Sequence, residues 1–189
     1  FAHQTQVARL EDAQRQRRVG EEHRSERKHR HDGHAPSQHR QTYSGRVPRL
    51  PASIRPDVPG PGQESVWGYP RPPRVEPVPV RVTVRLGGQL IADTHDAVRV
   101  LETSHPPVYY LPISDFAPGS LVDAEGTSFC EFKGAARYLD VVGGGITRAG
   151  AAWNYPHPAP GYAVLRDRVA VYAAAMDECT ADGEVVTPQ

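Results

Sequence analysis

The segment Cys130-Glu131-Phe132-Lys133 brings a thiol, a carboxylate and an amine together within four residues. Lys133 is the only lysine among residues 64–189, where nine arginines supply the other permanent positive charges. A nearby ammonium lowers the pKa of a thiol, and a lysine can lose its proton on burial whereas an arginine cannot. On a strand, Cys130 and Phe132 would share one face, with Glu131 and Lys133 on the other. A bend at Gly134 would then bring Lys133 around. The alternative is a buried, inert cysteine beside a surface lysine.

Glu102, followed by Thr103, is a second candidate. It lies between an apolar segment and the rigid Pro106-Pro107 pair. A carboxylate in this position suits a general base or a ligand anchor. It equally suits an ion pair with Arg99 or the cap of a turn. We interpret Glu102, Cys130 and Lys133 as candidate catalytic residues that face one cavity.

Aromatic residues are the third group, because twelve of the fourteen lie after residue 63. A Trp-x-Tyr-Pro-x-Pro pattern occurs twice, beginning at Trp67 and at Trp153. It predicts two similar corners in which both indole rings are buried, with chance repetition as the alternative. These rings either line a pocket or form the ordinary core of a small β domain. The predicted ligand-binding residues are Glu102, Thr103, Tyr110, Cys130, Lys133, Tyr138, Trp153 and Tyr155.

Familiar cofactor and metal motifs do not occur. We find no phosphate-binding loop, no dinucleotide fingerprint after a strand and no nucleophile elbow. Gly119-Ser120 with Asp123 and Glu125 resembles a nucleotidyltransferase pattern only faintly, because its spacing is too short to set two carboxylates behind a phosphate-binding turn. The histidines after residue 63 lack ligand spacing, and two cysteines do not make a four-cysteine zinc site. We therefore expect neither a metal nor a cofactor.

Strands with one polar face dominate the elements that would position these residues. Val80, Val82, Val84 and Leu86 alternate with polar residues, and Gly87-Gly88 then marks a hairpin. Helix signals are confined to short turns near residues 114–115, 161–166 and 173–176. This spacing of strands, glycines and prolines predicts a compact, mostly antiparallel β domain. The further predicted strands are 89–93, 97–101, 108–111, 127–132, 135–142, 146–154 and 168–172.

The two parts of the chain differ in composition. Residues 1–63 contain 12 basic and 7 acidic residues and about 22% apolar residues, whereas residues 64–189 contain 10 basic and 15 acidic residues. Such a polar segment cannot offset its chain entropy by burial, so we predict that residues 1–63 are a disordered basic tail ending in a proline-rich linker. The basic cluster at 24–31 would suit a nucleic acid. The alternatives are a solvated tail or an artefact of the assigned gene start. Residues 64–189 are the predicted β domain.

Taken together, these segments resemble a bacterial family, domain of unknown function 427. The resemblance spans nearly all of residues 64–186. It implies a β-tent-like fold, whose superfamily includes zinc-site and ligand-pocket proteins, and the family is sometimes catalogued as nucleotidyltransferase-like. The chain lacks the paired Cys-x-x-Cys knuckles of the zinc-bearing members, and the family implies no established reaction. The matching stretches are 64–73, 91–94, 102–112, 130–138 and 151–156.

The leading functional prediction is a cytoplasmic domain that binds a small molecule in an aromatic pocket. No stretch approaches the roughly 20 apolar residues of a membrane-spanning helix, and the first residues do not resemble a signal peptide. Two alternatives stay open. One is an enzyme that uses Glu102, Cys130 and Lys133, and the other is an interaction module whose basic tail binds nucleic acid. The sequence identifies no ligand and predicts no particular oligomeric state.

Overall fold

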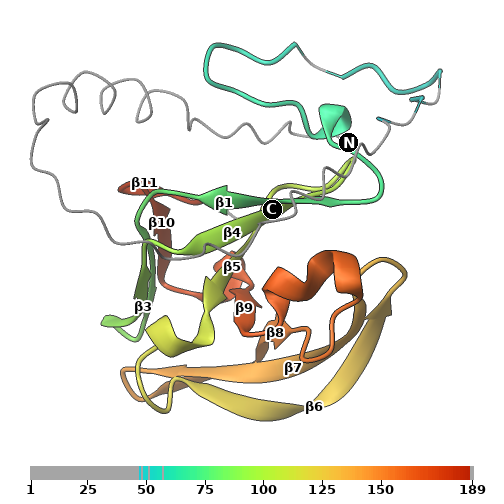
Figure 1. Cartoon of the computed structure of the whole chain (residues 1–189). Coiled ribbons are helices and arrows are strands. Elements are labelled where there is room, and N and C mark those ends of the chain that lie inside the picture. Colours follow the sequence, from blue (N-terminus) through green and yellow to red (C-terminus); the bar gives the residue numbers. More distant parts are fainter. Residues whose placement is uncertain (1–46, 48, 51, 57, 188–189) are drawn as a thin grey trace, which may run out of the picture.

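The computed structural model describes residues 47, 49–50, 52–56 and 58–187 (Figure 1). In this part of the chain, eleven β-strands occur with four short 3-10 helices, which confirms the prediction of a mostly antiparallel β domain with only short helical turns. No helix among the described residues is long and apolar enough to cross a membrane. The predicted basic cluster at 24–31, and with it most of the predicted tail, lies outside the described residues.

The strands form two sheets in which every pairing is antiparallel. The larger sheet has the order β1 (Arg74–Val78), β4 (Ala97–Leu101), β5 (Val108–Pro112), β9 (Arg168–Val171), β8 (Ile146–Asn154), β7 (Gly134–Gly143) and β6 (Leu121–Cys130). The smaller has the order β11 (Glu184–Val185), β10 (Glu178–Ala181), β2 (Val82–Leu86) and β3 (Gln89–Thr94). The 3-10 helices are η1 (Val66–Gly68), η2 (Ile113–Asp115), η3 (Pro160–Leu165) and η4 (Ala173–Ala175).

Alternating side chains explain the clearest hairpin, β2–β3. Val82, Val84 and Leu86 are buried, whereas Arg85 on the same strand is exposed. Gly87 and Gly88 then adopt φ of 59° and 72°, the left-handed values that a tight two-residue hairpin turn requires. The predicted strand pattern and turn are both confirmed here.

One prediction about local structure was wrong. The predicted strand 127–132 is β6, which begins at Leu121 and ends at Cys130, so residues 131–133 form a turn and the predicted alternation of faces stops there. Trp67 and Trp153 are neither exposed nor fully buried, which does not contradict their predicted substantial burial, while Tyr69 and Tyr155 of the same two motifs are each 5% exposed. The tyrosine is therefore the ring that anchors each motif in the core.

Each face of the large sheet has its own core. Between the two sheets lies an inter-sheet core that includes Val84, Leu111, Val141 and Val169. The opposite face carries a second cluster, the inner core, which η3 closes with Tyr162 and Leu165 (Figure 1). The other buried members of the inner core are Val98, Val100, Tyr110, Ala136, Tyr155 and Ala170.

A buried ion cluster fastens the segment before β1 to β4. Arg99, which is 9% exposed, donates to both oxygens of Glu64 at 3.0 Å and to Glu76 at 2.9 Å. The Tyr69 hydroxyl donates to Glu64 at 2.8 Å. Burial and the bond to Glu64 raise the pKa of Tyr69 well above its ordinary value. This cluster holds residues 64–73 against the sheet and so fixes the position of Arg71.

Candidate functional site

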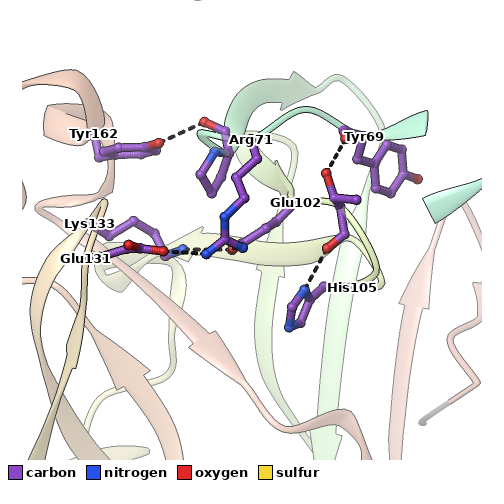
Figure 2. A network of polar contacts seen from close by, with 9 residues as sticks. Tyr69, Arg71, Glu102, His105, Glu131, Lys133 and Tyr162 are labelled. Atoms are coloured by element: carbon purple, nitrogen blue, oxygen red, sulfur yellow. Dashed lines mark hydrogen bonds and ion pairs between the residues drawn. The ribbon is translucent and has the colours of Figure 1, made fainter. Parts of the chain in front are cut away.

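Ion pairs join three distant chain segments near the tip of the β6–β7 hairpin (Figure 2). Arg71 precedes β1, Glu102 directly follows β4, and Glu131 and Lys133 belong to the hairpin turn. One Glu102 oxygen, Oε1, accepts from Arg71 Nη1 at 3.0 Å, and the other, Oε2, lies 3.5 Å from Lys133 Nζ. Arg71 also contacts Glu131. Glu102 is thus a carboxylate held between two cations from different parts of the chain.

The hairpin turn buries Lys133. Cys130 pairs with Gly134, whose φ of 100° lets the chain reverse after residues 131–133. The Lys133 carbonyl accepts a bond from the Ala159 amide at 3.0 Å, and the residue is 7% exposed. Phe132 lies beneath Arg71, whose guanidinium carbon is 5.0 Å from the ring centroid. The predicted bend at Gly134 is confirmed, but the turn rather than a strand face places Lys133.

Glu102 and Thr103 make different contacts. Glu102 pairs with Arg71 and Lys133, whereas Arg99, the alternative partner, is engaged by Glu64 and Glu76. The Thr103 hydroxyl donates to the Tyr69 carbonyl, and the Thr103 carbonyl lies 3.0 Å from His105 Nδ1 (Figure 2). Thr103 therefore holds the loop after β4 in place, which orients Glu102.

Two buried tyrosines lie behind the ion pairs. The Trp153 indole nitrogen donates to the Tyr110 hydroxyl at 3.1 Å, and the ring centroids of Tyr110 and Tyr155 are 6.3 Å apart. Burial is the main cause that raises the pKa of both tyrosines, and the neighbouring Cys130 thiol and Glu102 carboxylate contribute for Tyr155. Tyr155 is therefore a ring neighbour of Tyr110, and Cys130 packs against the inner core to which both tyrosines belong.

Tyr138 and Trp153 belong to a different part of the same sheet face. Tyr138 on β7 is the cross-strand partner of Trp153 on β8. The Trp153 ring also packs on Tyr172, with ring centroids 4.5 Å apart. The predicted ligand residues thus divide into a polar group around Lys133 and an aromatic group around Trp153, separated by the buried Tyr110.

Sequence reasoning did not single out Arg71 for the site. Its signal was its place in the first Trp-x-Tyr-Pro-x-Pro motif, directly after Pro70. The nucleotidyltransferase-like residues lie elsewhere: Ser120 is buried and donates to the Ala117 carbonyl, and Asp123 and Glu125 are exposed on β6. Among the described residues, no group of three or more His, Cys, Asp or Glu side chains is arranged to hold a metal ion.

Comparison with known families identifies the domain. The family model described as "Domain of unknown function (DUF427)" matches residues 74–182, which is more than half of the chain. The chain belongs to this family. Within the DUF427 region lie Glu102, Cys130, Lys133 and Tyr155, and Arg71 lies just before it. A comparison with curated proteins found no match.

Proposed function

We propose that this DUF427 domain binds a small molecule whose carbonyl or carboxylate oxygen accepts hydrogen bonds from Lys133. The observation that carries the proposal is the incomplete pairing of a buried ammonium. The Lys133 side chain is 9% exposed, and the one acceptor that its Nζ meets among the described residues is Glu102 Oε2, at 3.5 Å. An ammonium has three donors, and strong N–H···O bonds are 2.7–3.2 Å long.

The surroundings support an oxygen-bearing ligand. Buried charged groups are costly unless they are well paired, so a ligand oxygen close to Lys133 would stabilise the site. Glu102 already pairs with Arg71, which also lies over the Phe132 ring, so these side chains are partly ordered before binding and the conformational cost would be limited. Phe132 and the buried Tyr155 provide apolar surface beside the polar groups. Together these features are typical of sites in which a few polar groups orient a ligand.

Native mass spectrometry with a stability screen tests the proposal. The wild-type domain is compared with Lys133→Met, which keeps the stem but removes the ammonium, and with Arg85→Met as an exposed control cation. We expect a retained small molecule, or stabilisation by a carboxylate or carbonyl compound, in the wild type and the control only. A ligand at 100 times its Kd stabilises by about 2.7 kcal/mol. Equal binding by Lys133→Met, or no binding across the panel, would contradict the proposal.

The enzyme alternative uses the same residues, with Cys130 as the reacting group. It is favoured by the position of Cys130, which packs against the inner core that contains Tyr155 and lies three residues before Lys133. A ligand that stays attached to Cys130 in the mass spectrum under denaturing conditions would support the enzyme. A ligand that dissociates on denaturation would support simple binding.

A further inference from the structure

Three aromatic side chains outside the group around Lys133 form a row across neighbouring strands. Tyr138 on β7 and Trp153 on β8 are cross-strand partners, and Tyr172 follows the end of β9. Trp153 is the cross-strand partner of Ala170 on β9, and the ring of Tyr172, two residues further along the chain, packs on that of Trp153. We call these three side chains the aromatic shelf.

The central ring of the shelf, Trp153, is held in place, and the shelf is partly open to solvent. Trp153 is fixed from below, because its indole nitrogen donates to the buried Tyr110 and the two rings meet edge to face at 83°. Tyr172 is 47% exposed, and Tyr138 and Trp153 are half-buried. The ring of Trp153 lies 4.5 Å from that of Tyr172. A shelf that is already ordered does not have to lose side-chain freedom when a ligand binds.

The charge of the domain limits which ligand can occupy the shelf. Residues 64–189 contain 15 acidic and 10 basic side chains, a net charge of 10 − 15 = −5. β6, the strand beside β7, carries no basic residue, and its Asp123 pairs with Leu139 and so points to the other face from Tyr138. Phosphate-rich ligands such as oligonucleotides are therefore disfavoured, because they bind through basic side chains. Uncharged flat rings stack on aromatic faces without needing a counter-charge.

We propose that the aromatic shelf of Tyr138, Trp153 and Tyr172 is a binding site for an uncharged planar heterocycle, separate from the Lys133 site. The buried Tyr110 lies between the two: it accepts from Trp153 on one side and neighbours Tyr155 on the other. A ring bound at the shelf therefore does not need Lys133. This proposal goes beyond the proposed function and does not depend on it.

Fluorescence of Trp153 tests the shelf directly. The chain has two tryptophans, so Trp67→Phe leaves Trp153 as the single indole. In this background, caffeine and adenosine are titrated as uncharged probes, and adenosine monophosphate and methyl β-glucoside are titrated for comparison. We expect saturable quenching by caffeine or adenosine. The nucleotide should bind more weakly because of its negative charge, and the glucoside should not bind.

Variants decide whether the quenching comes from the shelf. Tyr172→Ala and Tyr138→Ala should each weaken binding at least about fivefold, because loss of one stacking ring costs roughly that much. Phe129→Ala removes an aromatic ring that is 78% exposed on β6 and should change nothing. Lys133→Met should also leave ring binding intact, which separates this test from that of the proposed function. No saturable quenching, tightest binding of the nucleotide or the glucoside, or unchanged affinity in Tyr172→Ala would overturn the proposal.

Discussion

Two hairpin turns, one from each sheet, meet closely, and their contact can be tested with paired glycine substitutions. A Cβ atom on Gly144, in the β7–β8 turn, would lie 2.6 Å from the carbonyl carbon and 2.7 Å from the Cα of Gly87, in the β2–β3 turn. Gly145 also has a positive φ, but a Cβ there would meet nothing within 4 Å. Gly144→Ala and Gly145→Ala thus share the cost of placing alanine at a positive φ, and only Gly144→Ala adds a steric overlap with Gly87.

The expected losses of stability follow from the cost of a positive φ and from the steric overlap. A non-glycine residue in the left-handed region costs about 1–2 kcal/mol, which is the whole effect expected for Gly145→Ala. Overlap in a packed region adds about 1–3 kcal/mol, so Gly144→Ala should lose about 2–5 kcal/mol. Urea unfolding followed by tryptophan fluorescence, with an unchanged m value, measures the difference.

A second matched pair guards against an effect peculiar to one turn. Gly87→Ala would bring a Cβ within 2.8 Å of the Gly144 Cα, whereas a Cβ on Gly88 meets nothing within 4 Å. Gly87→Ala should again be the more destabilising of the two. If the members of both pairs lose the same stability within about 0.5 kcal/mol, the turns do not touch as described and the reasoning fails.

Further predictions concern buried polar groups. Arg99→Ala should lower the free energy of unfolding by about 3 kcal/mol, because it leaves two carboxylates without their buried cation. The control Arg74→Ala, at an exposed position, should cost less than about 1 kcal/mol. Similar losses for the two variants in urea unfolding would contradict this prediction. Burial raises the pKa of Tyr155, so the unfolded chain releases the phenolic proton at a lower pH than the folded chain does. The free energy of unfolding should therefore fall as the pH rises above about 10, and Tyr155→Phe should make this fall less steep. An equally steep fall in Tyr155→Phe would refute the prediction. Burial raises the pKa of the Cys179 thiol to about 11. At pH 8 a thiol reagent should therefore modify the half-buried Cys130 first and Cys179 only when the protein unfolds. Equal rates of modification of the two cysteines would be inconsistent with the fold.

Strands with a clear two-residue period were predictable from sequence. The bounds 97–101 and 146–154 match β4 and β8, because apolar residues and flanking turn residues mark both ends. β6 was predicted six residues too short at its start, since most of its residues are exposed and show no apolar alternation. β1 was missed because it contains Pro77, which an edge strand tolerates and a central strand does not.

The site was only partly predictable, because residues that contact one another in it lie far apart along the chain. Lys133 could be singled out because it is the only lysine among residues 64–189 and precedes a glycine, and Glu102 because it lies before a pair of prolines. Both signals are local in the sequence. Their contact spans 31 residues, and the contact of Arg71 with Glu131 spans 60. Such pairings depend on strand order, in which β1 and β4 lie at one end of the large sheet and β6 and β7 at the other. The spacing of residues along the chain carries no information about that order.

The repeated Trp-x-Tyr-Pro motif acquires a physical meaning once both copies are placed. In the first copy, the buried Tyr69 donates to Glu64 and Arg71 follows two residues later to contact Glu102. In the second, Tyr155 is 5% exposed, and Trp153, two residues earlier, donates to the buried Tyr110. Each motif buries its tyrosine as an anchor and places a neighbouring polar group at a defined contact, Arg71 at Glu102 and the Trp153 indole at Tyr110. The repeated pattern is therefore structural in both copies, and the first copy contributes the cation that pairs with Glu102.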